Sequence, residues 1–271
     1  MSTVAAPAPR PLDISGTPRV PMSRLAKVEF RKALDTRAGR WFIIAILALV
    51  VVVEVIYSFA ANAASDQSKN FQDYVQISGF VLGYFMPIII IMLVTGEASQ
   101  RNGLVTFTLE PQRSRVVVAK FLAGLALGAS VLLVAFILAG LGTLFGIVTG
   151  GSPEWSLDGH LLFNGFVLSN LIGIFIGFAI GMLIMNTAGA IVAYFVYSLI
   201  LPTAVGILSA LSDGFEKIAP WIEFNTAQTP LFSDDYTPTG QEWAQIAVAG
   251  TIWLVIPLAF GIWRLLRMEF K

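Results

Sequence analysis

The sequence has no cysteine and little charge. Only 13% of its 271 residues are charged and 56% are hydrophobic, whereas roughly 25% of the residues in an ordinary soluble domain are charged. So few polar side chains could not cover the surface of a soluble globule of this size. The absence of cysteine excludes disulfides and thiolate metal sites within the chain.

The signatures of common enzymes are also missing. There is no Gly-x-x-x-x-Gly-Lys-Ser/Thr loop that would hold the phosphates of ATP. No His-Glu-x-x-His motif occurs, and the single histidine, His160, cannot form a histidine-rich metal site or a bis-histidine haem site. The sequence therefore predicts no catalytic residue, no metal or cofactor on this chain, and no nucleic-acid partner.

Charge is absent from several long blocks. A bilayer core about 30 Å thick needs roughly 20 apolar residues per helix. Strands of a membrane barrel would alternate apolar and polar residues, whereas residues 43–50 are continuously apolar. The longest block, 161–212, suffices for two helices joined near Asn186 and Gly189, which end helices readily. The sequence predicts an all-α integral membrane fold with six transmembrane helices, at about residues 41–62, 75–95, 116–148, 161–185, 189–211 and 243–265.

The basic residues lie mostly on one side of these predicted spans. Of the 17 basic residues, 15 precede the first span, lie between the second and third, or follow the sixth. Only Lys69 and Lys217 lie in the opposite loops. Because cytoplasmic loops of membrane proteins carry the excess of Lys and Arg, both termini are predicted to be cytoplasmic.

The first 40 residues divide into two parts. Residues 1–21 contain five prolines and few large apolar groups, which predicts a disordered cytoplasmic tail before a six-helix domain at 22–271. In residues 22–40 an apolar side opposes a basic side at helical spacing, although Glu29 interrupts the apolar side. This segment either is a basic flank that only fixes the orientation, or forms an interfacial helix that also touches a cytoplasmic partner. We adopt the second interpretation, with these contact residues: Arg24, Lys27, Phe30 and Arg31.

Proline and glycine inside the spans predict bends and close contacts. Pro87, Pro202 and Pro257 lie near the middles of the second, fifth and sixth spans, where a missing backbone hydrogen bond bends a helix. In the fourth span glycine recurs every four residues, at Gly173, Gly177 and Gly181, which leaves one helix face without side chains. We expect hinges at the prolines and a tightly packed neighbour at the glycines.

The segment between the fifth and sixth spans, residues 213–242, is too aromatic for a solvated linker. It contains three phenylalanines and one tryptophan within residues 213–232. We predict short helices that dip back toward the bilayer or cap its outer face, with breaks at Pro220 and Pro230.

One acidic residue lies inside a predicted span. Glu54 is thirteen residues past Trp41, about 20 Å along a helix, and so nearer the outer surface than the midplane. Its carboxylate either reaches outer water beside Tyr57 and Ser58, or lines a wet cavity where it contacts substrate or a proton. If Glu54→Gln transports as well as the wild type across a pH series, the second interpretation fails.

The strongest local pattern lies between the second and third spans, at residues 96–120. A Gly-Glu step at the end of the second span is followed by a short apolar segment, then by Pro111, then by a basic group that enters the third span. Here the sequence resembles the permease subunits of the ABC-2 type transporter family, whose loop has the same order of features. The layout of residues 22–271 is similar as well, and the doubled pair Arg113 and Arg115 departs from the family's Pro-x-Ser-Arg form.

The resemblance implies a transport subunit and not an enzyme. Two six-helix subunits, identical copies or sister permeases, would pair in a bacterial inner membrane above two separate ATPase subunits that carry ATP and Mg. ATP-driven alternating access would then export the substrate. The loop would act as the coupling helix, an apolar plug with charges around it. Its contact residues would be Glu97, Arg101, Leu104, Val105, Phe107, Leu109, Arg113 and Arg115.

In this family the second and fifth spans face the partner subunit and form the translocation path. On that analogy the path residues would be Phe80, Tyr84, Tyr194, Ser198 and Leu201, with Glu54 as a possible polar addition. Neither span contains a charge. This favours a lipophilic or amphipathic cargo, such as a drug, a lipid or a modified peptide.

Two other classes stay open at this point. An ion-coupled secondary transporter would need no ATPase, but such folds use polar or charged residues near the midplane, and only Glu54 qualifies. A non-transporting membrane scaffold is the other alternative. The proteins that co-purify with the chain distinguish the three classes.

The predicted topology puts position 113 in the cytoplasm and position 217 outside. A membrane-impermeant reagent added to intact cells is expected to label a reactive group placed at Lys217 and not one placed at Arg113, because the bilayer separates them. Labelling of both positions at equal rates would contradict the arrangement of the spans.

Overall fold

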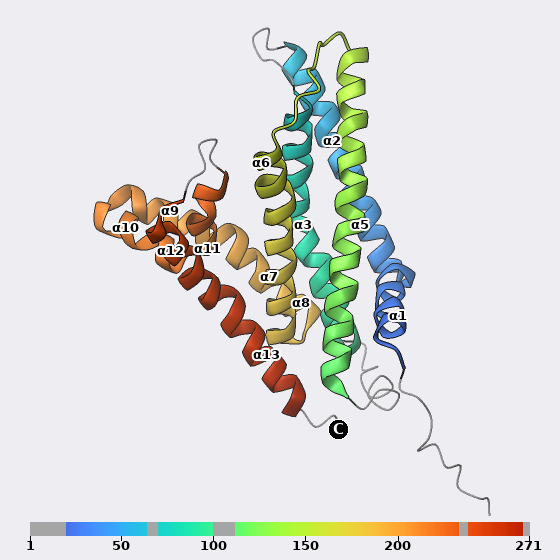
Figure 1. Cartoon of the computed structure of the whole chain (residues 1–271), viewed down its shortest axis with the longest axis vertical. Helices are drawn as coiled ribbons and strands as arrows, with labels where there is room; N and C mark the ends of the chain where they lie inside the picture. Colours follow the sequence, from blue (N-terminus) through green and yellow to red (C-terminus); the bar gives the residue numbers. More distant parts are fainter. Residues whose placement is uncertain (1–19, 64–69, 100–111, 233–237, 268–271) are drawn as a thin grey trace, which may run out of the picture.

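The computed structural model describes residues 20–63, 70–99, 112–232 and 238–267. Within these ranges the chain is helical and contains no β-strand, only an isolated bridge between Asn70 and Glu154. Six helices are long and apolar enough to cross a membrane (Figure 1), which confirms the predicted number of spans. They are Arg37–Ala60, Phe71–Gly96, Arg113–Val148, Gly159–Ile184, Thr187–Leu211 and Gly240–Arg267.

The first three spans are continuous helices, and each of the other three contains a π-helical turn. Helix α1 (Met22–Asp35) comes first, followed by α2 (Arg37–Ala63), α3 (Phe71–Ser99) and α5 (Arg113–Val148). The fourth span consists of α6 (Gly159–Leu161), η1 (Leu162–Leu168) and α7 (Ser169–Ile184). The fifth consists of α8 (Thr187–Phe195), η2 (Val196–Ile200) and α9 (Leu201–Leu211). The sixth consists of α12 (Gly240–Gly250), η4 (Thr251–Val255) and α13 (Ile256–Arg267).

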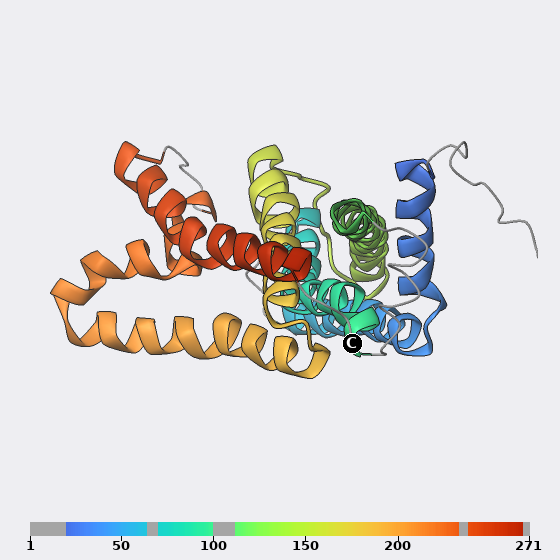
Figure 2. The ribbon, with the colours of Figure 1, turned by 90° about the horizontal axis from the view of Figure 1, so that it is seen from below.

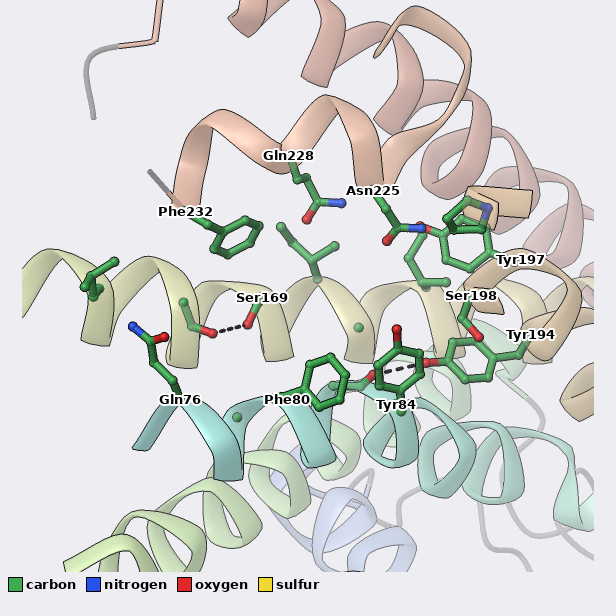
Figure 3. A pocket seen from close by; sticks show the side chains of 18 residues that line it. Gln76, Phe80, Tyr84, Ser169, Tyr194, Tyr197, Ser198, Asn225, Gln228 and Phe232 are labelled. Atoms are coloured by element: carbon green, nitrogen blue, oxygen red, sulfur yellow. Dashed lines mark hydrogen bonds between the residues drawn. The ribbon is translucent and has the colours of Figure 1, made fainter. Parts of the chain in front are cut away.

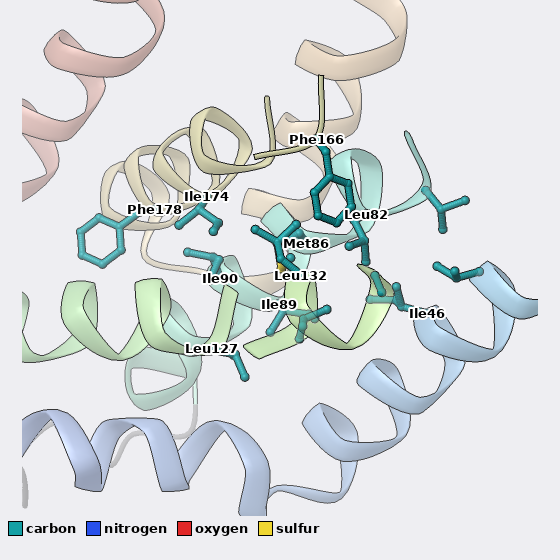
Figure 4. Packing of buried hydrophobic residues seen from close by; sticks show 14 of the residues in the cluster. Ile46, Leu82, Met86, Ile89, Ile90, Leu127, Leu132, Phe166, Ile174 and Phe178 are labelled. Atoms are coloured by element: carbon teal, nitrogen blue, oxygen red, sulfur yellow. The ribbon is translucent and has the colours of Figure 1, made fainter. Parts of the chain in front are cut away.

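The spans form a bundle from which two of them extend outward. Helices α2, α3, α5 and α7 pack around one another, and the fifth and sixth spans lean away from this group (Figure 2). Helix α3 is central, because 67% of its most apolar stretch is buried, against 17% in the fifth and sixth spans. The main hydrophobic cluster lies around it, with Met86 and Ile90 fully buried beside Leu127 of α5 and Phe178 of α7 (Figure 4).

The glycines of α7 lie against α3, which confirms the predicted tight packing. A Cβ atom added to Gly177 would lie 2.6 Å from the carbonyl oxygen of Pro87 and 2.8 Å from its Cα. At Gly173 the added atom would lie 3.3 Å from the Pro87 ring, and at Gly181 it would lie 3.2 Å from Val94. The two backbones therefore touch with no side chain between them, as small residues allow in membrane proteins.

The prolines of the fifth and sixth spans each follow a widened turn. Pro202 comes two residues after η2, and Pro257 comes two residues after η4. A proline lacks the N–H and its ring clashes with the carbonyl four residues earlier, and the wider π turn relieves this conflict because its hydrogen bonds span five residues. Pro87 instead lies within the continuous helix α3, against the glycine face of α7.

Short helices occupy the segment between the fifth and sixth spans, as predicted. They are α10 (Asp213–Ile222), α11 (Phe224–Gln228) and the 3-10 turn η3 (Thr229–Phe232). The predicted break at Pro220 is wrong, because this proline lies inside α10. The helix ends two residues beyond it, and the chain becomes extended at Glu223, with φ −114° and ψ 118°. Pro230 lies in η3.

Replacing Gly177 by alanine is expected to lower the melting temperature of the detergent-solubilised protein. The added methyl group would push against the backbone of Pro87, and overpacking of this kind costs about 1–3 kcal/mol. Gly206→Ala in α9 is the matched control, because a Cβ at that position would meet nothing within 4 Å. Equal melting temperatures for the two variants would contradict the backbone contact.

Candidate binding site

An open pocket of about 510 Å³ lies between the second, fourth and fifth spans, and α11 and η3 cover one side of it (Figure 3). Helix α3 contributes residues spaced three and four apart, which is one side of an α-helix. These residues are Gln76, Gly79, Phe80, Gly83 and Tyr84. The facing wall comes from η1 and α7 and includes Gly165, Ser169 and Gly173.

The pocket contains four of the five residues predicted for a translocation path. Phe80, Tyr84, Tyr194 and Ser198 line it. Leu201 is not among the lining residues, and the adjacent Pro202 is. The π turn η2 explains this difference. Because a π turn contains one extra residue, the next residue that faces the pocket comes one position later than in an α-helix.

Aromatic rings form much of the wall. Phe80 and Tyr84 pack edge to face, with ring centres 5.1 Å apart. Tyr197 lies on the fifth span with its ring centre 5.1 Å from that of Trp253 in η4, which ties the wall to the sixth span. Phe232 of η3 adds a fifth lining ring. The cavity therefore offers flat apolar surfaces on several sides.

Neutral polar groups lie between the rings. The Tyr194 hydroxyl donates a hydrogen bond of 3.0 Å to the carbonyl of Gly83, and the Gln228 side-chain amide donates one of 2.9 Å to the carbonyl of Phe224. The Ser198 hydroxyl is buried and has no hydrogen-bond partner among the described residues. Because an unsatisfied buried hydroxyl costs free energy, Ser198 is a polar group that a bound molecule could satisfy.

Glu223 lies fully buried at the start of α11 and holds this helix in place. Its Oε1 accepts hydrogen bonds from the backbone and side-chain nitrogens of Asn225, at 2.9 and 2.8 Å. Its Oε2 accepts from the backbone nitrogen and hydroxyl of Thr226, at 2.6 and 2.7 Å. A carboxylate is well placed at a helix N-terminus. The sequence analysis missed Glu223, although an acidic residue two positions before Asn225 and three before Thr226 is a helix-start signal.

No Lys, Arg, Asp or Glu side chain lines the pocket within the part of the chain that the structure describes. That part also contains no group of three His, Asp or Glu residues able to hold a metal ion. His160 lies in α6 with its Nε2 at 2.9 Å from the amide nitrogen of Asn164, outside the pocket lining. The pocket can therefore bind a molecule through its shape, its aromatic rings and its neutral polar atoms.

Glu54 is buried in the helix bundle and does not line this pocket. Its exposed fraction is 3%, and its Oε1 accepts a hydrogen bond of 2.6 Å from Ser78. Its other oxygen faces Gly142 of α5, where an added Cβ would lie 2.7 Å away. The interpretation that the carboxylate reaches water beside Tyr57 and Ser58 is therefore wrong, because α3 and α5 cover it.

A buried ion pair fastens α1 to α5. Glu29 is 4% exposed, and its two oxygens lie 2.7 Å from Lys120 of α5 and 2.7 Å from Lys32 of α1. Lys120 is buried as well. The acidic residue on the apolar side of α1 is therefore not an irregularity of the pattern, because it meets a lysine from another helix.

The predicted contact residues of α1 lie on two faces. Phe30 packs, partly buried, against the main hydrophobic cluster. Arg24, Lys27 and Arg31 are exposed. Helix α1 thus presents a basic face away from the bundle.

Most of the predicted coupling loop lies outside the described residues. This applies to Arg101, Leu104, Val105, Phe107, Leu109 and the side chain of Glu97.

The two described members of this loop make contacts within the chain. Arg113 donates a hydrogen bond of 2.9 Å to the carbonyl of Leu265 in the last turn of α13, where a cation complements the helix dipole. Arg115 donates to the carbonyl of Val20, just before α1. The first turn of α5 is therefore connected to both the first and the last described helix.

Comparison with protein-family models and with curated proteins finds no match for this chain. Its function is therefore inferred from its own residues, namely the pocket, the contacts at the first turn of α5, and the sequence pattern at 96–120.

Lys120→Met is expected to loosen α1, because Glu29 would stay buried with the partly exposed Lys32 as its ion-pair partner. Removing one member of a buried pair costs about 3–5 kcal/mol.

Cysteine labelling measures the detachment of α1 from the bundle. The chain has no cysteine, so a single cysteine can be placed at Ala33, which packs against the core. Its labelling by maleimide should become about tenfold faster with Lys120→Met. The rate should not change with Lys27→Met, whose side chain is exposed; equal rates in both variants would contradict a structural role for the pair.

Proposed function

We propose that this chain is the membrane-spanning permease subunit of an ATP-driven exporter of the ABC-2 type. In this proposal both termini are cytoplasmic, and the chain pairs with a second copy or a sister permease in a bacterial inner membrane. Two separate ATPase subunits bind ATP and Mg. A lipophilic or amphipathic substrate leaves the cytoplasm by alternating access, and the pocket is part of its path.

The position of the pocket carries the proposal. It lies between the second and fifth spans, which the family resemblance assigns to the path, and four residues chosen on that analogy line it. Its wall combines five aromatic rings with neutral polar groups and, in the described residues, no charged side chain. Pockets of this kind bind apolar molecules that carry a few polar groups.

The pocket extends from one end of the bundle toward its middle. Its lining begins at Gln76, near the start of α3, and at Leu161, near the start of the fourth span. Both starts lie at the end of the bundle far from α1 and from the end of α13 (Figure 1). With cytoplasmic termini, the pocket lies toward the outer half of the membrane, and export is the direction that the family resemblance implies.

The opposite end of the bundle supplies a physical route from an ATPase to the spans. Arg113 bonds the end of α13, Arg115 bonds the chain before α1, and Lys120 is paired with Glu29. All three belong to the first eight residues of α5. A displacement of the loop before α5 would therefore move α1, α5 and α13 together.

Glu54 weighs against an ion-coupled carrier. In such carriers the coupling groups lie at the substrate site, whereas Glu54 is bonded to Ser78, packed against Gly142 and absent from the pocket lining. A scaffold, the other alternative, has no need of an open aromatic pocket.

The proposal is tested first by co-purification. The tagged chain, extracted from its native membrane in mild detergent, is expected to bring an ATPase subunit with it, and lipophilic compounds should raise the rate of ATP hydrolysis. A solitary chain that still transports after reconstitution would favour the ion-coupled carrier. A large complex without an ATPase would favour the scaffold.

Phe80→Ala is expected to raise the compound concentration needed for half-maximal ATPase stimulation by about tenfold or more, because burial of a phenylalanine ring contributes about 1.5–3 kcal/mol. Phe163→Ala is the matched control. Both rings are highly exposed, at 68% and 58%, but only Phe80 lines the pocket. An equal response of the two variants would argue that the pocket is not the substrate site.

A further inference from the structure

Two of the hydroxyl groups that line the pocket, those of Ser169 and Tyr194, donate their protons to backbone carbonyls. The Tyr194 hydroxyl gives its proton to the carbonyl of Gly83 at 3.0 Å. The Ser169 hydroxyl gives its proton to the carbonyl of Gly165 at 2.6 Å. A hydroxyl group has one proton and two lone pairs. Each of these oxygens therefore keeps lone pairs, and no proton, for a molecule in the pocket.

The side-chain amides of Asn225 and Gln228 in α11 both use their nitrogen for a hydrogen bond within the protein. The Asn225 nitrogen donates to the carboxylate of Glu223 at 2.8 Å, and the Gln228 nitrogen donates to the carbonyl of Phe224 at 2.9 Å. Because carboxylate and carbonyl oxygens only accept, these bonds identify which amide atom is the nitrogen. The amide oxygens of Asn225 and Gln228 are turned toward the cavity (Figure 3).

The surroundings of the wall also favour positive charge. Glu223 accepts four hydrogen bonds and lies fully buried directly behind Asn225. Phe80, Tyr84 and Tyr194 line the pocket, and the face of an aromatic ring attracts ammonium groups because it is the negative side of the ring quadrupole. Among the described residues no Lys or Arg lines the pocket to compete for these groups.

We propose that the pocket binds an amphipathic organic cation, a molecule with one protonated amine or ammonium group on an apolar body. An ammonium group has donors and no acceptor, so it matches a wall that presents oxygen lone pairs and rings. An anion would find no Lys or Arg to pair with among the described residues that line the pocket. The inference rests on the proposed function and specifies its substrate class.

The ammonium group and the apolar body of such a molecule bind in different parts of the cavity. The amide oxygens of Asn225 and Gln228 face the hydroxyl of Tyr84 across the cavity (Figure 3), and the ammonium group binds between them. The apolar body lies along Phe80 and the side-chain-free surface of Gly79 and Gly165, in the direction of the exposed end of the pocket.

The inference is tested by binding to the purified chain in lipid nanodiscs. Radiolabelled dodecylamine is bound and then displaced by unlabelled dodecylamine, dodecanol or dodecanoate, which share one alkyl chain and differ in the head group. Dodecylamine is expected to displace the label at a concentration about tenfold below that of dodecanol. Dodecanoate is expected to be the weakest competitor.

Charge variants at Gln76 should fold normally, because this lining residue is exposed at the edge of the pocket. They therefore test binding separately from folding. Gln76→Glu should strengthen dodecylamine binding about fivefold and Gln76→Lys should weaken it about fivefold, whereas dodecanol should respond to neither change. Tyr84→Leu should weaken amine binding, and Tyr84→Phe should restore most of it because the ring is kept.

Two results would overturn the inference. One is equal or stronger displacement by dodecanol or dodecanoate, and the other is amine binding that ignores the sign of the charge at position 76. Neither result touches the proposed function, which depends on the co-purified ATPase and on the contrast between Phe80→Ala and Phe163→Ala. Amine binding without any ATPase partner would leave the substrate class intact and refute the exporter.

Discussion

The direct contact between the backbones of α3 and α7 determines where the other helices can lie. At Gly177 no side chain separates α7 from the backbone of Pro87, which is how small residues let two helices approach closely. Helix α3 thereby becomes the centre of the bundle, with α2 and α5 on its remaining sides. The pocket lies beside this contact, between α3, the fourth span and the fifth span.

Three buried carboxylates show how a chain with little charge places the charge it has. Burial of an ionised group costs free energy unless the group is paired or hydrogen-bonded, so each needs compensation. Glu29 is compensated by two lysines, Glu223 by four hydrogen bonds, and Glu54 by Ser78 in a site that Gly142 leaves room for. In each case the carboxylate helps to hold a particular pair of segments together: α1 with α5, α11 with its own preceding turn, and α2 with α3.

The spans could be predicted from sequence because the cost of ions in hydrocarbon acts on every residue of a segment, and a run without Lys, Arg, Asp and Glu is visible directly. The glycine face of α7 was predictable for a similar reason, since a period of four identifies one helix face without knowledge of the neighbour. The partner of Glu29 was not predictable, because Lys120 is 91 residues away and a pairing over that separation leaves no local pattern.

The pocket residues fall between these cases. The family resemblance selected the second and fifth spans, and four residues chosen on that analogy line the pocket: Phe80, Tyr84, Tyr194 and Ser198. Leu201 does not, because the α-helical period that relates it to Ser198 is interrupted by η2. Glu223 and Asn225 were missed because their role depends on α11 folding back over the spans, a tertiary arrangement with no counterpart in local spacing.

The π turns give the last three spans a property that rigid helical rods lack. A π turn is a helical turn that contains one residue more than an α-helical turn. If the π turn moves along the helix by one position, the residue that it passes rotates by about 100° around the helix axis. Both ends of the span keep their places during such a step. Tyr197 and Ser198 lie within η2 itself, so their side chains can swing into or out of the cavity while the helix neither tilts nor slides. The residues that line the pocket can therefore change when the π turn moves a few positions along the helix, without movement of the whole helix against the surrounding lipid.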